Sequence, residues 1–261
     1  MFAGQRQSLI LSMVNECGSL SVSEIQRRLQ VSRETIRRDL NELADRNVLR
    51  KAHGGVLSLG LTEIERTEPV LAEREVANVE AKRAIGRLAV SLVPDGASVV
   101  LSSGSTPQCV ADALLARRGL TVFCNSLGVA TRLANRNGNR VHMLGGEIQA
   151  NNNSTLGADS VAMLSNYHVD FAFVGAGAIA ADGWIMDYTR EEADLHRLML
   201  RTAGAAVVVA DYSKFNRFAP VRVDTFEKVT HLVTDHRPDG GLAQVLAPHP
   251  LEVLLTAEGS A

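Results

Sequence analysis

The turn SSGSTP, residues 102–107, places small hydroxyl side chains around a glycine, between an apolar run and a helical pattern. Gly104 allows a close backbone approach, and Ser103, Ser105 and Thr106 offer hydroxyls beside the free N–H groups of a helix start. Such a turn binds anions, because its N–H groups and the helix dipole both favour negative charge. We predict a phosphate site here; the alternative is a serine-rich helix cap without a ligand.

Two further turns with polar or flexible residues follow apolar runs. MLGGE places Gly145 and Gly146 after one run, and ADYSKF places Asp211 and Lys214 after the most apolar run of the chain. Lysine is scarce, with four residues against 23 arginines. We expect Lys214 to contact a phosphate or a sugar hydroxyl, although an exposed loop lysine is the simpler alternative.

The stretch VGAGAIA raises the alternative of a dinucleotide site. Gly175, Gly177 and Ala180 match the G-x-G-x-x-A fingerprint after an apolar run. The fingerprint should open a domain and lead into a helix, with an acidic residue about 20 residues on. Here ADGWIMDYTREE follows instead. An NAD-sensing repressor therefore stays the weaker alternative.

A sugar-phosphate isomerase-like enzyme that carries a DNA-binding domain is the alternative from another class. Such an enzyme needs a carboxylate base near the reacting carbons of the sugar. Asp187, Glu147 and Glu191 are candidates, but the sequence positions none of them. We expect no catalytic residues, no cofactor and no metal site.

The segment VSRETIRRDLNEL, residues 31–43, concentrates positive charge on one helical pattern. Ile36, Leu40 and Leu43 recur at i, i+4 and i+7 and form one apolar stripe. Arginine suits both guanine edges and phosphate oxygens, which makes this a candidate recognition helix for DNA. The polar candidates are Ser32, which is also the expected N-cap, Arg33, Glu34, Thr35, Arg37, Arg38 and Asn41.

The flanking segments predict the elements that would present this helix. An apolar stripe predicts a first helix that ends at Glu16, and SLSVSEIQRRLQ predicts a second with Ser21 and Glu24 at capping-box spacing. NVLRKAHGGVLSL predicts a β-hairpin wing that turns at Gly54–Gly55. A helix-turn-helix followed by a wing is a DNA-binding arrangement.

The charge distribution agrees with DNA binding by the N-terminal part. Residues 1–57 hold nine basic and six acidic residues, a net charge of +3, whereas the remainder carries −5. DNA phosphates attract the basic part alone.

From Val70 on, short apolar runs alternate with helical patterns. Helices are expected within 81–93, 108–118 and 127–136, and strands in segments that begin at residues 97, 120, 140, 170, 205 and 228. This alternation predicts a doubly wound, mostly parallel α/β domain, which binds ligands at the carboxyl ends of its strands.

The whole chain has 261 residues and accommodates two domains. We expect a DNA-binding domain at 1–57, a linker at 58–69 and an α/β domain at 70–261. The sequence has no membrane-span pattern and no evident signal peptide. Three cysteines without metal-ligand spacing indicate reduced thiols in a cytoplasm.

The segment VSRETIRRDLNELADRNVLRKAHGGV resembles the winged-helix signature of the DeoR family of bacterial transcriptional regulators. The family pattern is V-S-x-x-T-I-R-R-D-L, then L, then R-x-H-G-G. The matching wing residues are His53, Gly54 and Gly55, with Arg50 or Lys51 as the wing base. The resemblance implies that Arg50, Lys51 and His53 contact DNA, together with the residues of the recognition helix.

The second part resembles the DeoR sensor domain, whose fold resembles that of sugar-phosphate isomerases. The family turns correspond here to Arg74 and Lys82, to 103–106, to Asn125 in N-S-L, to 144–146 and to 211–215. The resemblance therefore implies that Arg74, Lys82 and Asn125 belong to the effector site as well. One departure is Ser102, which stands where the family usually has Asp before S-G-S-T.

The resemblance also implies a function. It predicts a repressor of a carbohydrate or polyol catabolism operon that releases its operator DNA when a phosphorylated sugar or polyol binds. It implies a homo-oligomer, either a dimer or a tetramer, and no membrane partner.

Overall fold

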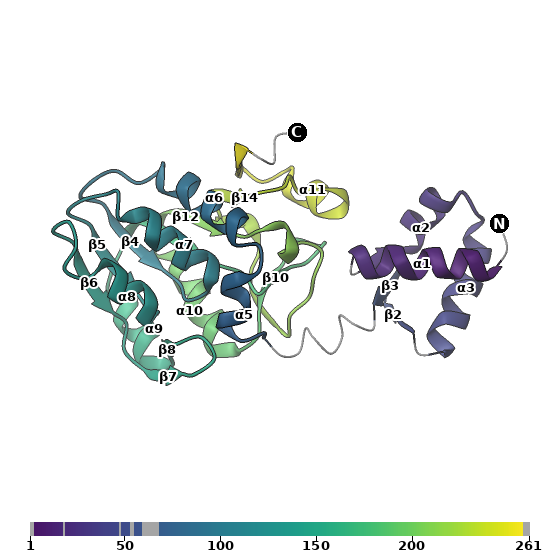
Figure 1. Cartoon of the computed structure of the whole chain (residues 1–261), viewed down its shortest axis with the longest axis horizontal. Helices are drawn as coiled ribbons and strands as arrows, with labels where there is room; N and C mark the ends of the chain where they lie inside the picture. Colours follow the sequence, from purple (N-terminus) through teal and green to yellow (C-terminus); the bar gives the residue numbers. More distant parts are fainter. Residues whose placement is uncertain (1–2, 18, 47, 53–54, 59–67, 258–261) are drawn as a thin grey trace. The chain divides into compact units, whose positions relative to one another are not determined.

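The computed structural model describes residues 3–17, 19–46, 48–52, 55–58 and 68–257 (Figure 1). The chain divides into two compact units, Met1–Glu68 and Pro69–Ala261. The linker expected at 58–69 falls mostly on residues 59–67, outside the described residues, and the expected domain boundaries remain a prediction. No helix of the described part has the length and apolar character that crossing a membrane requires.

The first unit is a three-helix domain with a small antiparallel sheet. Its helices are α1 (Ala3–Cys17), α2 (Val22–Leu29) and α3 (Arg33–Asp45). Strands β2 (Leu49–Ala52) and β3 (Gly55–Ser58) form the predicted wing hairpin, but Gly55 pairs with Ala52 and does not lie in the turn that was predicted at Gly54–Gly55. A third strand, β1 (Ser19–Ser21), pairs with β3 and was not predicted. Ten buried apolar residues, among them Ile36, Leu40 and Leu43, form the core of this unit.

The helix starts of this unit follow the predicted caps. The Ser21 hydroxyl accepts the Glu24 N–H at 3.1 Å, and the Ser32 hydroxyl accepts the Thr35 N–H at 3.2 Å. Gly55 begins β3, and a Cβ atom there would lie 2.4 Å from the Leu20 carbonyl oxygen. Glycine is therefore required where β1 and β3 approach each other.

The second unit is built on a seven-stranded sheet in which every neighbouring pair is parallel. The strand order is β15-β14-β12-β9-β4-β5-β6. The strands are β4 (Ser98–Leu101), β5 (Thr121–Cys124), β6 (Arg140–Met143), β9 (Val169–Val174), β12 (Ala203–Val209), β14 (His231–Thr234) and β15 (Glu252–Leu255). The predicted parallel α/β fold is confirmed, and the strand order reverses between β4 and β9.

Two hydrophobic layers cover the two faces of this sheet (Figure 1). One layer packs α6 (Val79–Val90), α7 (Ser105–Leu114) and α8 (Leu127–Leu133) against the sheet. The other packs α9 (Ala158–Leu164), α10 (Arg190–Arg201) and α11 (Gly240–Leu246). Adjacent sheet residues such as Val99 and Val100 enter opposite layers, as the period of a strand requires.

The sequence did not predict β15 or the helices α9, α10 and α11. It also did not predict the shorter elements that connect the strands and helices of this unit. They are α5 (Leu71–Val76), the hairpin β7 (Glu147–Gln149) and β8 (Ser154–Leu156), the small sheet β10 (Ala178–Ile179), β11 (Ile185–Asp187) and β13 (Val221–Asp224), and the 3₁₀ turns η1 (Tyr212–Lys214) and η2 (Phe226–Lys228).

Candidate DNA-binding helix and effector site

Helix α3 presents the predicted polar residues to solvent. Of these, Ser32, Arg33, Glu34, Arg37, Arg38 and Asn41 are exposed. Thr35 is half-buried, and its hydroxyl lies 2.8 Å from the Ser32 hydroxyl at the helix start. The apolar stripe is fully packed into the core, so the opposite, basic face is free for a partner.

A buried ion pair, which was not predicted, fixes the orientation of α3 on α1. Asp39 is 3% exposed, and its carboxylate accepts two hydrogen bonds from the Arg6 guanidinium of α1, at 2.5 and 3.0 Å. Gln7 of α1 donates to Glu42 one turn further along α3, at 2.6 Å. The bidentate geometry holds α3 against α1 and therefore sets the direction of the basic face.

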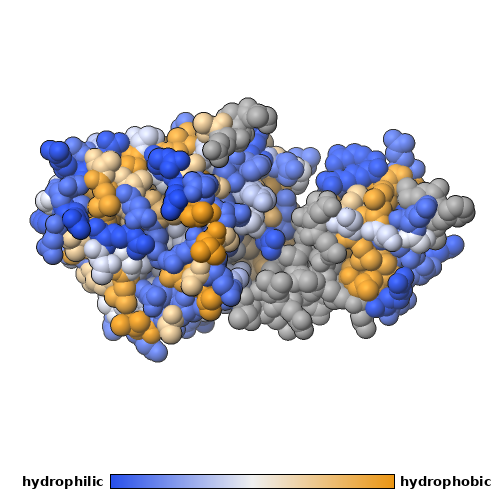
Figure 2. Space-filling model, viewed as in Figure 1, coloured by the Kyte–Doolittle hydropathy of each residue, from blue (hydrophilic) through white to orange (hydrophobic). Residues whose placement is uncertain are grey.

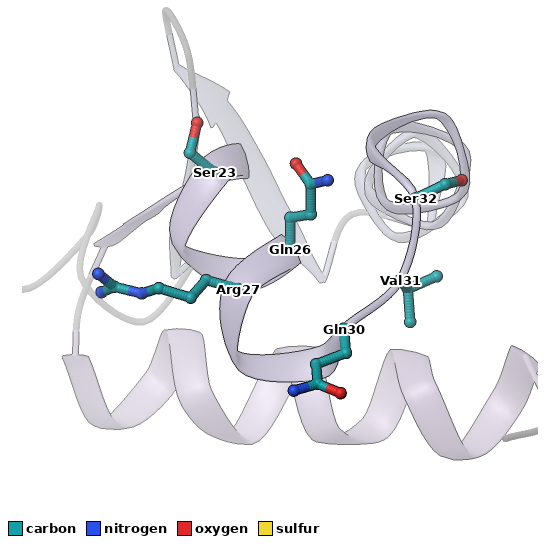
Figure 3. Close-up of a pocket in the computed structure, with 6 residues that line it drawn as sticks. All are labelled: Ser23, Gln26, Arg27, Gln30, Val31 and Ser32. Carbon is teal, nitrogen blue, oxygen red and sulfur yellow. The ribbon is translucent and has the colours of Figure 1, made fainter.

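A shallow hollow of about 570 Å³ adjoins the start of α3 (Figure 3). Its lining is mostly polar: Ser23, Gln26 and Arg27 of α2, Gln30 at its C-cap, and Val31 and Ser32 before α3. The α2 residues recur at i, i+3, i+4 and i+7, opposite the buried Ile25. That spacing in the sequence indicates this polar face, which was not predicted.

The wing residues are only partly described. Arg50 and Lys51 lie on β2, opposite Leu57 and Val56 of β3. His53 lies outside the described residues, so its predicted DNA contact remains a prediction.

The candidate effector residues collect at the carboxyl edge of the parallel sheet. The strand ends of β4, β5, β6, β9 and β12 face the same edge because all these strands run in parallel. Open parallel sheets form their ligand crevice where the strand order reverses, which here is between β4 and β9.

Ser102 ties the two strands at this reversal point together. Its hydroxyl accepts the Gly175 N–H at 3.0 Å and donates to the Ser103 carbonyl at 3.2 Å. A Cβ atom on Gly175 would lie 3.2 Å from Pro107, so the turn after β9 packs tightly on the start of α7. The residue that replaces the family Asp thus acts within the protein, and the position supplies no carboxylate to a ligand.

The predicted phosphate turn forms the first turn of α7. Gly104 has a φ of +124° at the N-cap position, and no side chain caps the helix there. Ser105 and Thr106 begin the helix and are 7% and 6% exposed. The N–H groups of a first helical turn have no partner within the helix, so an anion is a suitable acceptor for them.

Asn125 and Ser103 brace this turn. The Asn125 side chain is fully buried, accepts the Ser103 N–H at 2.8 Å and donates to the Thr155 carbonyl at 3.1 Å. Asn125 therefore joins the end of β5, the phosphate turn and the β7–β8 hairpin.

Asp211 and Lys214 lie beyond the end of β12, on the same edge. Asp211 is fully buried, and its Oδ1 accepts from the Asn78 side chain at 2.9 Å and from the Ser213 N–H at 3.1 Å. Its Oδ2 is buried and has no hydrogen-bond partner among the described residues. Lys214 is half-buried on η1.

Arg74 and Lys82 engage protein groups near this edge. The Arg74 guanidinium donates to the Pro69 carbonyl at 2.9 Å and to the Asn152 side chain. The Lys82 ammonium donates to the carbonyls of Arg74 and Ala77. Burial lowers the pKa of Lys82, and the nearby Asp211 carboxylate opposes that shift. Direct effector contact by these two residues remains a prediction.

Gly145 and Gly146 have different surroundings after β6. Gly146 has a φ of +121°, and a Cβ atom there would lie 2.3 Å from the Leu156 carbonyl oxygen. The nearest atom to a Cβ on Gly145 would be 3.9 Å away. Because the β7–β8 hairpin packs closely on Gly146, that position requires glycine. Gly145 has no such close neighbour and leaves open space at the edge.

The dinucleotide alternative lacks the helix start that it needs, and the three candidate carboxylates of the enzyme alternative have different surroundings. VGAGAIA leads from β9 into the two-residue strand β10 and not into a helix, so no helix start follows the glycines. Asp187 is buried with its carboxylate 2.6 Å from the His196 Nδ1, and Glu147 and Glu191 are exposed. Across the described residues, no group of three acidic, histidine or cysteine side chains is arranged for a metal ion.

Comparison with known proteins finds a family match for each of the two units. A model of the DeoR-like helix-turn-helix domain matches residues 6–60, and a model of the DeoR C-terminal sensor domain matches residues 77–236. The glycerol-3-phosphate regulon repressor of Escherichia coli is 31% identical over 96% of this chain and 98% of its own length. The transcriptional repressor GlcR of Bacillus subtilis is 30% identical over 99% of this chain and 98% of its own.

Among solved structures, ribose 5-phosphate isomerase A of Methanocaldococcus jannaschii aligns with 53% of this chain and 55% of its own. The identity is 20% and the TM-score is 0.40. The full-length relatives are regulators, in agreement with the expectation that this protein is not an enzyme. The chain thus belongs to the DeoR family of DNA-binding transcriptional regulators.

Proposed function

We propose that this protein represses an operon for the breakdown of a carbohydrate or polyol, and that a phosphorylated sugar or polyol releases it from its operator. Its relatives include a repressor named for the glycerol-3-phosphate regulon, which is consistent with a polyol phosphate. We place its action in the cytoplasm.

One observation carries the proposal for the effector. The same sheet edge holds a helix start without a side-chain cap, at α7, and a buried carboxylate oxygen without a described partner, at Asp211. The helix start suits a phosphate dianion, whereas the carboxylate oxygen suits a hydroxyl donor. A phosphorylated sugar or polyol has both groups.

The spacing of the two groups supports a single ligand. Strand β9 separates β4 from β12, and neighbouring strands lie about 4.8 Å apart, so the two strand ends are roughly 10 Å apart. Ser105, Thr106 and Lys214 would hold the phosphate. Asp211 would accept a hydroxyl hydrogen bond, since its negative charge repels a phosphate.

A thermal-shift screen of phosphorylated sugars and polyols tests this proposal. A ligand at 100 times its dissociation constant should stabilise the protein by about 2.7 kcal/mol. The same compound should release operator DNA in a titration, and its unphosphorylated parent should not. If no phosphorylated compound stabilises the protein, or if the parent works equally well, the proposed effector class is wrong.

On DNA, we propose that α3 reads base edges and that Arg50, Lys51 and His53 of the wing contact the backbone. Winged helices work in pairs on two-fold operators, so a dimer or tetramer is expected to bind a palindrome. Footprinting on a two-fold site and on one half-site tests this. Full affinity for an isolated half-site would contradict paired binding.

A further inference from the structure

A side-chain hydrogen bond joins the proposed effector edge to the start of the second unit. Asn78 donates from Nδ2 to Oδ1 of Asp211 at 2.9 Å, although 133 residues separate the two in sequence. Asn78 lies at the elbow between α5 and α6 and has a left-handed backbone, with φ of 51° and ψ of 35°. Asparagine tolerates this region better than most residues do.

The two carboxylate oxygens of Asp211 differ in their hydrogen bonds. Oδ1 receives both described donors, Asn78 Nδ2 and the Ser213 N–H. Oδ2 is buried and has no described donor. Buried carboxylate oxygens require hydrogen bonds, so Oδ2 calls for a donor from outside the described protein atoms. A ligand hydroxyl can donate, whereas the dianion of a phosphate monoester carries no proton to donate.

The elbow itself does not depend on the Asn78 amide. The Lys82 ammonium holds the carbonyl oxygens of Arg74 and Ala77, the latter at 2.7 Å, and the Lys82 N–H bonds the Asn78 carbonyl at 3.0 Å. None of these contacts involves the Asn78 side chain. The amide is therefore available for one task, which is to fix the rotation of the Asp211 carboxylate.

We propose that Asn78 is a positioning residue for effector recognition, which orients Asp211 so that Oδ2 accepts a hydroxyl of the ligand. The inference rests on the proposed function, because it needs a ligand with both a phosphate and a hydroxyl. It separates two parts of recognition: Asn78 and Asp211 act on the hydroxyl, and the α7 start with Lys214 acts on the phosphate.

The test compares Asn78→Gly with the full-length wild-type protein. Glycine tolerates the left-handed backbone and removes the side chain with its amide. The probes are glycerol 3-phosphate and glucose 6-phosphate, which bear hydroxyls, and inorganic phosphate, all titrated by calorimetry. We expect the dissociation constant of whichever hydroxyl-bearing probe binds the wild type to rise about tenfold, as the loss of one well-placed hydrogen bond predicts. The constant for inorganic phosphate should not change.

A second variant of Asn78 and a control variant at another position complete the test. Asn78→Asp removes the donor and places a second carboxylate against Asp211, so it should weaken the hydroxyl-bearing probe more than Asn78→Gly does. Asn135→Gly is the matched control, since Asn135 is exposed and also left-handed, with φ of 57°, but lies after α8. It should bind every probe like the wild type.

The outcomes separate this inference from the proposed function. If Asn78→Gly binds all probes like the wild type, or loses inorganic phosphate as much as the sugar phosphates, the positioning role is wrong while the effector class stands. If the wild type binds inorganic phosphate but neither hydroxyl-bearing probe, both the effector proposal and this inference are overturned.

Discussion

Arg37 and Arg38 are adjacent and both exposed on α3, and we expect them to contact different parts of a DNA duplex. Successive residues on a helix are 100° apart, and Arg38 lies opposite the buried stripe whereas Arg37 lies on its flank. Arg38 is thus the better placed to reach base edges, and Arg37 to reach phosphates. An arginine with a bidentate contact to guanine contributes about 1–3 kcal/mol of discrimination.

We predict that Arg38→Ala weakens operator binding by that amount and relaxes sequence preference, because it removes a base contact. Arg37→Ala should weaken operator and unrelated DNA alike and reduce the salt dependence of binding, because it removes a phosphate contact. Fluorescence anisotropy with both DNAs at several salt concentrations measures this. Wild-type affinity of both variants at physiological salt would show that α3 is not the recognition helix.

Asp39 follows Arg38 in the sequence, but its side chain is buried and binds α1 instead of facing solvent. Asp39→Asn should lower the melting temperature of the DNA-binding unit, because the Arg6 guanidinium would lose its charged partner in a largely buried site. Operator affinity should fall with it, since α3 loses its anchor on α1. Asp45→Asn, at an exposed position of the same helix, is the control and should change neither quantity. Equal melting temperatures for Asp39→Asn and the wild type would refute an anchoring role.

At the scale of elements, local patterns were sufficient for the first unit and for one face of the second. Apolar stripes at helical spacing predicted the three helices of the first unit, and Ser21 and Ser32 predicted the caps of two of them. Continuous apolar runs predicted six of the seven parallel strands, whose turns share one edge, whereas β15 and the helices α9, α10 and α11 were missed. Placement on that edge follows from parallel pairing alone, which is why residues from distant segments were correctly grouped.

Other features that were missed depend on contacts between distant residues or on very short strands. The burial of Asp39 depends on Arg6, 33 residues away, and the orientation of Asp211 depends on Asn78. Strands of two or three residues, such as β1 and β10, are too short to show alternation. Gly145 and Gly146 looked equivalent in the sequence because only the β7–β8 hairpin, which was not predicted, distinguishes them.

This difference between the two glycines gives a prediction for the β7–β8 hairpin. Gly146→Ala should destabilise the second unit by about 1–3 kcal/mol or more, because its backbone has a positive φ and the new methyl group would overlap the Leu156 carbonyl oxygen. Gly145→Ala should change the free energy of unfolding little, since its Cβ would meet no atom closer than 3.9 Å. Urea denaturation of both variants measures this, and equal losses would contradict the packing argument.

Across the whole molecule, the two parts of the chain carry net charges of opposite sign. The DNA-binding part has a net charge of +3 and the remainder −5. On the face of the sensor unit shown in Figure 2, hydrophilic residues surround smaller hydrophobic patches. A negative unit is repelled by DNA, and it needs local positive groups to attract an anionic effector. We propose that Lys214 and the start of α7 supply such groups at the carboxyl edge.

This separation lets one substitution test the link between effector and DNA. Lys214→Ala should raise the effector concentration for operator release roughly ten- to a hundredfold, because charged hydrogen bonds contribute ~1.5–3 kcal/mol and each decade corresponds to ~1.4 kcal/mol. DNA affinity without effector should hardly change, since the residue lies in the other unit. The expected phenotype is a repressor that stays on its operator when the inducing sugar or polyol phosphate accumulates.

The measurement is an operator-release titration with the phosphorylated compound that stabilises the wild type most, alongside Lys228→Ala as the control. Lys228 also lies in a 3₁₀ turn of the second unit, η2, and has no predicted role in the effector site. Its variant should respond like the wild type, because the loss of a lysine elsewhere does not alter the phosphate site. If Lys214→Ala also released DNA at the wild-type effector concentration, the phosphate would have to be held without this lysine, by the α7 start or by residues not assigned to the site.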